Sequence, residues 1–224
     1  MTGANADAGA ETVGADPQAA DRRYREDPVG HFRDYAARLT AVLDDQGWEH
    51  AADLAHELLD CWRRGRQVFI TGNGGSAGNA VHLANDFTYA LSKIPGSGLR
   101  IHALPANSSI LTCLANDEGY DEVFAIQLAV QAREGDVLIV FSGSGNSGNI
   151  VRALEEARAI GMKSYAVVGF DGGKAKAMAD RTIHFSGNDM QIAEDAQLIL
   201  GHMINQWLFK HRHEIPSRRA RGNS

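Results

Sequence analysis

The sequence lacks several features that would place the protein in other classes. Only two of its 224 residues are cysteines, so a disulfide framework is excluded as the source of its stability. Acidic residues outnumber basic residues by 28 to 22, which leaves no broad positive field for a nucleic acid. No apolar stretch approaches the roughly 20 residues that cross a bilayer, and residues 1–20 lack the basic start and apolar centre of a signal peptide. We therefore expect a cytoplasmic protein that binds neither nucleic acid nor a membrane.

The two cysteines are expected to play the same role. Cys61 lies on the apolar side of a predicted helix, and Cys113 lies in the apolar run Ile110–Leu114. Surroundings of this kind favour reduced thiols packed in the core over a disulfide or a catalytic thiol.

The length of the chain allows one domain with appendages. Residues 1–20 are rich in Ala, Gly and Asp and are predicted to form a disordered leader. The predicted domain covers residues 28–210 and opens with two amphipathic helices, over Pro28–Asp45 and Ala51–Arg64. Residues 211–224 carry four Arg against one Glu, which is typical of a basic, flexible tail.

From Gln67 onward, short apolar runs alternate with segments of helical spacing. This alternation predicts an α/β fold with right-handed crossovers and a parallel sheet covered by helices on both faces. Five strands are predicted, over Val68–Thr71, Arg100–Leu104, Val137–Phe141, Ser164–Val168 and Thr182–Phe185. Helices are predicted over Ala77–Leu91, Ser109–Ala115, Asp121–Ala132, Ile150–Ile160, Lys174–Met178 and Met190–Lys210.

Two Gly/Ser/Asn loops, Gly72–Ser76 and Ser142–Ser147, each follow a predicted strand and open onto a predicted helix. In a parallel sheet both lie at the carboxyl edge, where ligands gather. Free backbone N–H groups, the helix dipole and serine hydroxyls together favour a phosphate. Neither loop matches the dinucleotide or Walker pattern. The loops therefore predict a pocket for a phosphorylated small molecule, the alternative being ordinary turns that use Gly and Ser for their backbone geometry.

Two predicted helices each carry a histidine and a carboxylate on one face. His82 and Asp86 are four residues apart, and Glu194 and His202 are eight apart, so each pair projects from nearly the same side of its helix. Such a set can form a Zn²⁺ quartet, although Fe²⁺, Mn²⁺ or Ni²⁺ would accept the same ligands. The same spacing is also common as charge pairing on a helix surface.

The motifs occur in the order found in sugar isomerase (SIS) domains. From about Phe32 to Phe209 the sequence resembles the sedoheptulose 7-phosphate isomerase, or phosphoheptose isomerase, family. The two loops mark the wider superfamily, while His82 and His202 point to the heptose branch. The motifs are Gly72–Ser76, Asn116-Asp117, Ser142–Ser147 and Gly172-Gly173-Lys174.

The resemblance implies a flavodoxin-like three-layer αβα sandwich and a homotetramer with active sites at subunit interfaces. It also implies a divalent metal, usually zinc, and conversion of sedoheptulose 7-phosphate into D-glycero-D-manno-heptose 7-phosphate. By position, Asp86 becomes the catalytic base and His202 the catalytic acid, and the metal ligands become His82, Asp86, Glu194 and His202. The residues expected to bind the phosphate are Ser142, Ser144 and Ser147. The substrate site as a whole is assigned to Asn73, Gly74, Gly75, Ser76, Asp86, Asn116, Asp117, Ser142, Gly143, Ser144, Ser147 and Glu194.

Three positions depart from the family pattern. Asp86 stands where the family has Glu, Glu194 stands where it has a Gln ligand, and Ala90 stands where an Arg is expected. Two carboxylates would neutralise a divalent ion, which strengthens metal holding and weakens the pull of the ion on substrate oxygens. The departures leave a related heptose or octose phosphate open as the substrate.

Other SIS proteins supply the competing interpretations. Some form tetramers that bind a protein partner or sense a sugar phosphate without catalysis, and others isomerise amino-sugar phosphates or cleave lactyl ethers. None of these functions requires the His and carboxylate set, so its presence favours the heptose phosphate isomerase.

Overall fold

The computed structural model describes residues 27–91, 93 and 97–215, and the chain divides into two units between Thr40 and Ala41. The first unit contains most of α2 (Pro28–Asp44), a helix in which no residue is buried. Apolar side chains such as Phe32, which is 67 % exposed, therefore lie open on this helix. The predicted leader, residues 1–20, lies outside the described residues.

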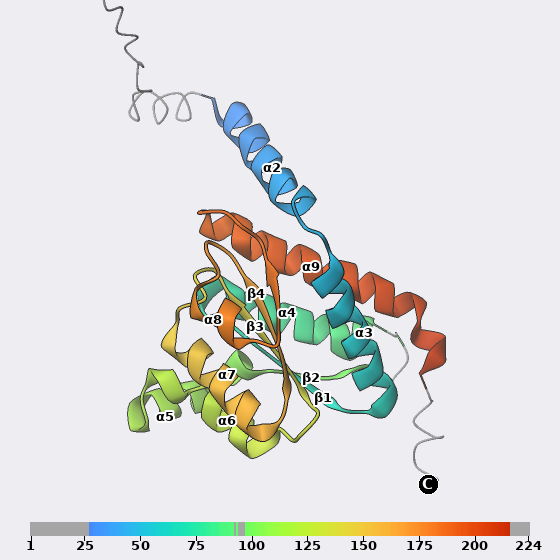
Figure 1. Ribbon diagram of the computed structural model, residues 1–224, viewed down its shortest axis with the longest axis vertical. Helices are drawn as coiled ribbons and strands as arrows, with labels where there is room; N and C mark the ends of the chain where they lie inside the picture. Colours follow the sequence, from blue (N-terminus) through green and yellow to red (C-terminus); the bar gives the residue numbers. More distant parts are fainter. Residues whose placement is uncertain (1–26, 92, 94–96, 216–224) are drawn as a thin grey trace, which may run out of the picture. The chain divides into compact units, whose positions relative to one another are not determined.

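A five-stranded parallel sheet forms the centre of the second unit (Figure 1). Its strand order is β2-β1-β3-β4-β5, so the order along the chain reverses between β1 and β3, the position where open α/β sheets bind ligands. The predicted sheet is thereby confirmed. The strands are β1 (Gln67–Thr71), β2 (Arg100–Ala103), β3 (Val137–Ser142), β4 (Lys163–Val168) and β5 (Arg181–His184).

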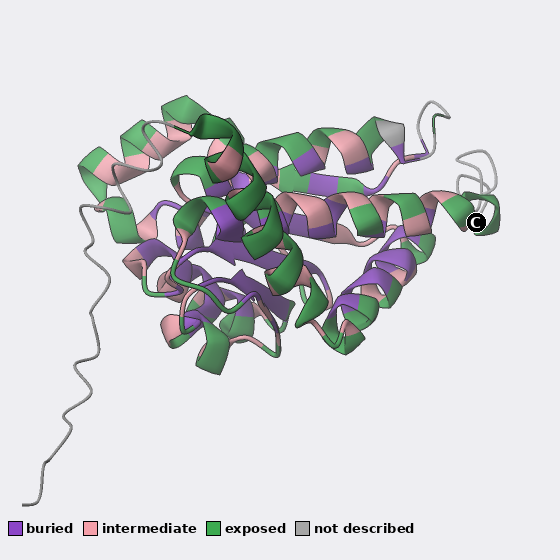
Figure 2. Cartoon of the chain, turned by 90° about the horizontal axis from the view of Figure 1, so that it is seen from above, coloured by how far each residue is buried: buried purple, intermediate pink, exposed green. Residues whose placement is uncertain are grey.

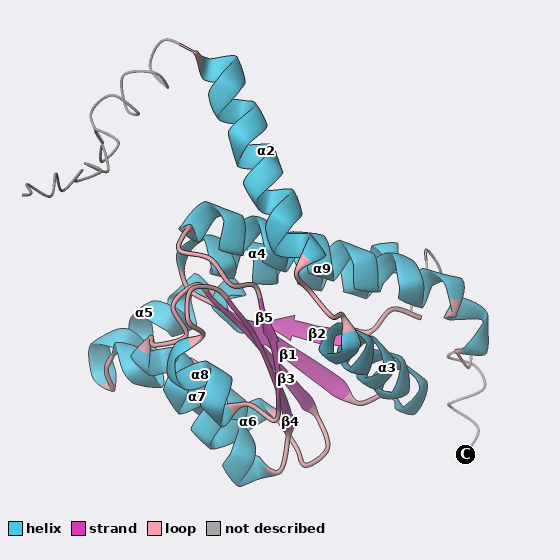
Figure 3. Cartoon of the chain, turned by 45° about the horizontal axis from the view of Figure 1, so that its top comes forward, coloured by secondary structure: helices cyan, strands magenta, loops and turns pink. Residues whose placement is uncertain are grey.

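Helices cover both faces of the sheet, which makes the expected three-layer sandwich (Figure 3). Figure 2 shows the buried strands between helices whose outer sides are exposed. One face carries α3 (Glu49–Arg64), α4 (Gly74–Asn85) and α9 (Met190–Lys210). The other face carries α5 (Ser108–Asp117), α6 (Ala125–Gln131), α7 (Gly148–Ile160) and α8 (Gly173–Met178). Among the described residues, no helix has the combined length and apolar character needed to cross a membrane.

Alternation along β1 explains why the second unit has two apolar clusters. Val68 and Ile70 point into the cluster with α3, α4 and α9, and Phe69 points into the cluster on the opposite face. Successive side chains of a strand point to opposite faces. An uninterrupted apolar run therefore predicts a strand that is covered on both sides.

Two predicted helices differ in the structure. The predicted helix Ala77–Leu91 is α4 followed by a π-helical turn, η1 (Asp86–Ala90), closed by the Leu91 N–H donating to the Asp86 carbonyl at 2.8 Å. The helix predicted over Asp121–Ala132 is confirmed over Ala125–Gln131, which is α6, but its predicted start is wrong. A 3-10 turn, η3 (Tyr120–Glu122), precedes α6 instead. Hydrogen bonds from Tyr120 and to Glu122 hold this turn, and such tertiary contacts override helix propensity.

The two cysteines differ in burial. Cys61 is buried, as predicted, and burial raises the pKa of its thiol to about 12. The prediction that Cys113 is a core thiol is wrong, because this residue is exposed on α5. That helix has no buried residue, and Leu111 and Leu114 are only partly buried against the sheet.

The chain past α9 continues as the short 3-10 turn η4 (Arg212–Glu214). Glu214 forms ion pairs with Arg63 and with His211. The remainder of the predicted basic tail, residues 216–224, lies outside the described part of the chain.

Candidate active site

The first loop connects β1 to α4 and leaves the start of that helix uncapped. Asn73 occupies the N-cap position with an extended backbone, yet its side chain makes no capping hydrogen bond. An N-cap asparagine ordinarily accepts a hydrogen bond from an N–H group of the first turn. Because the Asn73 side chain is used elsewhere, the first turn of α4 keeps unpaired donors and the positive end of the helix dipole.

The second loop connects β3 to α7 and has the chemistry of an anion site. Ser147 is the N-cap of α7 and makes no side-chain capping hydrogen bond. The hydroxyl oxygen of Ser142 accepts a hydrogen bond from the Gly145 N–H at 3.0 Å, and that of Ser144 accepts one from the Asn146 N–H at 3.3 Å. Each of these hydroxyls can still donate its own proton. The loop therefore offers hydroxyl and backbone donors at a helix N-terminus, as a phosphate requires.

A side-chain network joins the first loop to the first turn of α7, which directly follows the second loop. The Asn73 Nδ2 donates to Asn149 Oδ1 at 2.8 Å, and the Asn149 Nδ2 donates to Asn73 Oδ1, also at 2.8 Å. The Tyr120 hydroxyl donates to the same Asn73 oxygen at 3.0 Å. Since β1 and β3 are neighbours where the strand order reverses, the loops form one site at the carboxyl edge of the sheet.

Three of the four predicted metal ligands converge. The Nε2 atoms of His82 and His202 lie 3.0 Å apart, and Oδ2 of Asp86 lies 3.5 Å from the first and 3.6 Å from the second. His82 comes from α4, Asp86 from the π-helical turn and His202 from α9. The predicted approach of residues from two distant helices is therefore observed.

The spacing of these three atoms fits a metal ion. In a tetrahedral zinc site, ligands at about 2.0–2.2 Å from the ion lie about 3.3 Å from one another. The three observed separations, 3.0, 3.5 and 3.6 Å, bracket that value. Two imidazoles and one carboxylate leave a fourth position open, as in catalytic zinc sites.

Glu194 lies elsewhere. Among the described residues, the ligand atoms of His82, Asp86 and His202 all lie within 4.8 Å of one another. Glu194 is not part of this group. The Glu194 carboxylate lies against Gly75, in the first turn of α4, where any Cβ would collide with it. A carboxylate is favourable at this positive end of the helix. The role of Glu194 as a fourth metal ligand stays a prediction.

Asn116 and Asp117 lie exposed at the end of α5. The Asn116 amide donates to Oδ1 of Asp117 at 2.8 Å, and the Cys113 thiol donates to Oδ2 at 3.5 Å. Because the thiol hydrogen-bonds to a carboxylate, the pKa of Cys113 is raised. Asp117 thus has one partner on each oxygen.

Two other predicted substrate residues are buried. The Ser76 hydroxyl donates to Gln197 Oε1 at 2.9 Å, which ties α4 to α9. Gly143 lies below Met190, whose sulfur would collide with a Cβ at this position. These contacts give Ser76 and Gly143 clear packing roles within the site.

Sequence reasoning missed three side chains that hold the site together, namely Tyr120, Asn149 and Gln197. Asn149 follows the second loop by only two residues and is 1 % exposed. Its closeness to that loop is the only signal in the sequence. Tyr120 and Gln197 act through tertiary contacts that no local sequence pattern predicts.

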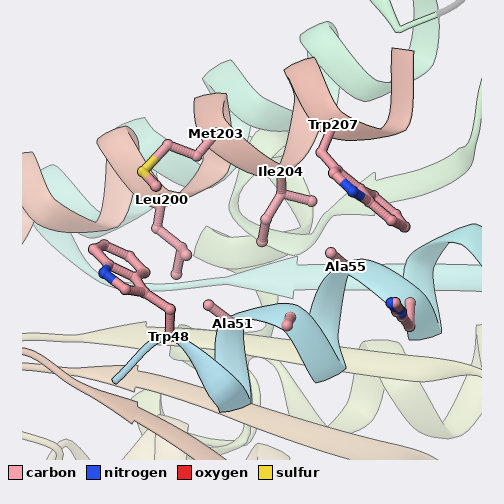
Figure 4. A pocket seen from close by; sticks show the side chains of 9 residues that line it. Trp48, Ala51, Ala55, Leu200, Met203, Ile204 and Trp207 are labelled. Carbon is pink, nitrogen blue, oxygen red and sulfur yellow. The ribbon is translucent and has the colours of Figure 1, made fainter. Parts of the chain in front are cut away.

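A separate groove lies between α3 and α9 (Figure 4). Its walls are almost entirely apolar, and it contains none of the predicted site residues. The lining residues are Trp48, Ala51, Ala52, Ala55, His56, Leu200, Met203, Ile204 and Trp207. This surface is suited to an apolar contact rather than to a sugar phosphate.

Known proteins resemble most of this chain. Residues 31–169 match the SIS domain. The chain is 37 % identical over 186 residues to a phosphoheptose isomerase from Chlorobium phaeobacteroides, covering 82 % of each chain. It is 36 % identical over 156 residues to the Helicobacter pylori protein of that name, covering 70 % of this chain and 81 % of the relative. The solved structure of phosphoheptose isomerase GmhA from Neisseria gonorrhoeae superposes with a TM-score of 0.75 at 30 % identity, covering 83 % of this chain and 98 % of that one.

Proposed function

Because the chain belongs to the phosphoheptose isomerase family of SIS-domain proteins, we propose that it converts sedoheptulose 7-phosphate into D-glycero-D-manno-heptose 7-phosphate. One observation carries the proposal. The imidazoles of His82 and His202 meet the Asp86 carboxylate in the same unit as two joined loops that suit a phosphate. A protein that only binds a sugar phosphate needs the loops but not this group.

The reaction moves a proton from C1 of the ketose to C2 through an enediol or enediolate. Asp86 is the proposed base that removes the C1 proton and returns it to C2. His202 is the proposed acid that protonates the C2 carbonyl oxygen, and it regains its proton from the C1 hydroxyl as that group becomes the aldehyde. Oδ2 of Asp86 faces the two imidazoles. Oδ1 accepts a hydrogen bond from the Asn85 amide at 3.2 Å. The two carboxylate oxygens therefore allow Asp86 to hold an ion with one and to carry the proton with the other.

A divalent metal is the proposed cofactor, with Zn²⁺ as the expected ion. His82, Asp86 and His202 would hold it, with Glu194 as the further ligand implied by the family resemblance. When bound, such an ion polarises the substrate oxygens and stabilises negative charge that develops on them.

The far end of the sugar is assigned to the second loop. Ser142, Ser144 and Ser147 would donate hydrogen bonds to the phosphate, together with the first N–H groups of α7. Anchoring the phosphate uses binding energy remote from the reaction to orient C1 and C2 against Asp86. Asn116, Asp117 and the first turn of α4 would line the space between the two ends.

We further propose a cytoplasmic homotetramer with active sites at subunit interfaces. Its support is that each unit has apolar surface of its own, at Phe32 on α2 in the first and in the groove with Trp48 and Trp207 in the second. Both cysteines are free thiols, as suits a reducing compartment. Sedimentation velocity of the full chain tests the assembly, and a monomer at micromolar concentration would contradict it.

An aldose–ketose assay of the metal-loaded protein tests the function. The substrates are pentulose, heptulose and octulose phosphates, and the expected result is conversion of the heptulose 7-phosphate with the highest kcat/KM. A higher kcat/KM for the octulose phosphate would show that the preferred substrate is a longer sugar phosphate. Binding of all three without conversion would replace the isomerase by a sugar-phosphate sensor.

A further inference from the structure

We propose that Asn149 is a positioning residue that acts through Asn73 to fix the distance between the phosphate-binding end and the reacting end of the active site. Tyr120 is the third member of the same network. The inference rests on the proposed isomerase function, which it deepens by assigning a role to residues beyond the metal group and the phosphate loop.

The amide of Asn149 is placed for this role. Asn149 lies in the first turn of α7 and is only 1 % exposed. Its Oδ1 accepts from Asn73 while its Nδ2 donates to Asn73, both at 2.8 Å. Only a side chain with one donor and one acceptor in the same plane completes such a reciprocal pair. Aspartate would lose the donor, and leucine would lose both groups.

The Asn73 oxygen is fully used by the network. Oδ1 of Asn73 accepts from both Asn149 and Tyr120, the latter at 3.0 Å, and these two bonds use both acceptor sites of the amide oxygen. Its Nδ2 already donates one proton to Asn149. The Asn73 side chain therefore braces the first loop, and its second Nδ2 proton is the one donor that the network does not use.

The brace lies beyond the end of the sheet. The ladder between β1 and β3 ends at the pair Thr71 and Val140, and β3 remains paired with β4 as far as Ser142. Asn73 and Asn149 therefore both lie beyond the paired residues of their strands. Asn73 precedes α4, which carries His82, and Asn149 belongs to α7, whose N-cap is Ser147. The amide pair thus joins the helix of the metal group to the helix of the phosphate site.

This connection has a kinetic consequence. A sugar phosphate bound at both ends must match the distance between the two helices, and a small misplacement of reacting groups lowers the rate strongly. Inorganic phosphate engages only one end. Loosening the brace should therefore weaken the binding and turnover of the sugar phosphate while leaving phosphate binding nearly unchanged.

The experiment compares Asn149→Ala with Tyr120→Phe in the full-length, metal-loaded protein. Four quantities are measured: the KM and kcat for heptulose 7-phosphate, the Kd of that sugar by calorimetry, the inhibition constant of inorganic phosphate, and the melting temperature. For Asn149→Ala we expect the Kd and KM to rise about tenfold and the phosphate constant to change less than about twofold. For Tyr120→Phe, which removes one hydrogen bond from an exposed residue, we expect the KM to rise about threefold.

Gln127→Leu is the matched control. Gln127 is also a buried amide, and it donates to the carbonyl of Val123, which lies just before α6, rather than between the two site loops. The Gln127→Leu substitution should lower the melting temperature and leave the KM for the sugar phosphate unchanged. If Asn149→Ala fails to fold, Tyr120→Phe decides the question.

The outcomes separate the inference from the function. The positioning role of Asn149 is contradicted if the inhibition constant of inorganic phosphate rises as much as the KM for the sugar phosphate. It is also contradicted if the KM is unchanged in both Tyr120→Phe and Asn149→Ala. A wild-type protein that binds heptulose 7-phosphate without converting it overturns the isomerase. In that case the calorimetric Kd of each variant still tests the brace.

Discussion

Nε2 of His82 lies 3.0 Å from Nε2 of His202, although 120 residues separate the two histidines along the chain. The two ring planes are inclined at 72°, and the short separation of the Nε2 atoms shows that these nitrogens point toward each other. A neutral imidazole has one nitrogen lone pair in its plane. Two such lone pairs beside the Asp86 carboxylate attract a cation, and this geometry is the basis of the first prediction.

His202→Ala should abolish stoichiometric metal binding, whereas Glu194→Gln should retain it. The first change removes one of three converging ligands, while the second leaves all three in place and keeps an amide oxygen at position 194. Elemental analysis after dialysis against metal-free buffer measures both. Loss of the ion in Glu194→Gln would show that the charge of the second carboxylate is needed to hold it.

Asp86→Asn should lower kcat by about 10²–10⁴-fold, which is the usual contribution of a general base. An amide cannot take the C1 proton, but the phosphate loop is untouched, so the inhibition constant of inorganic phosphate should stay the same. Metal content must be measured alongside, because Asp86 is also a proposed ligand. Full activity in a metal-loaded Asp86→Asn protein would exclude Asp86 as the base.

Local patterns predicted the parts of the fold and site that depend on local rules. The apolar runs predicted the five strands. The spacing of His82 and Asp86 on one helix predicted two of the four proposed metal ligands. The parts that were missed depend on tertiary packing. The turn at Tyr120 replaces the start of a predicted helix because its side chain bonds across to Asn73. Cys113 lies outside the core because α5 packs against the core through Leu111, Leu114 and Ala115. The position of Glu194 follows from the packing of α9 on α4, which helical spacing does not encode.

Cys113 should react with iodoacetamide in the native protein, and Asp117→Asn should accelerate that reaction. Cys113 is exposed, but its hydrogen bond to Asp117 raises the pKa of the thiol, so less reactive thiolate exists at a given pH. Removing the carboxylate lowers the pKa and increases the thiolate fraction. Mass spectrometry of alkylation at pH 8 measures the rates.

Cys61 supplies the internal control for this measurement. It is buried, and burial raises its pKa to about 12, so it should be alkylated only after unfolding. The proposed substrate site includes Asp117, so heptulose 7-phosphate should protect Cys113 from alkylation. Absence of protection at saturating sugar would remove Asn116 and Asp117 from the site.

Gly201→Ala should destabilise the protein even though alanine is the better helix former. A Cβ at Gly201, on α9, would collide with the Leu83 side chain on α4, and overpacking of this kind costs about 1–3 kcal/mol. The helix-propensity gain is only about 1 kcal/mol. Since His82 and His202 are the neighbours of these two residues, forcing the helices apart should also weaken metal binding.

Gly78→Ala is the control, because Gly78 also lies in α4 and a Cβ there meets no atom within 4 Å. It should raise the free energy of unfolding by about 0.5–1 kcal/mol. Leu83→Ala alone should lower it by about 2–5 kcal/mol by opening a cavity. In the Leu83→Ala/Gly201→Ala double variant the new methyl enters that cavity, so the loss should be smaller than the sum of the single losses. Urea unfolding measures the free energy of unfolding of all four variants. If the losses in Leu83→Ala and Gly201→Ala are additive, the close approach of Gly201 to Leu83 does not set the spacing of the two helices that carry the histidines.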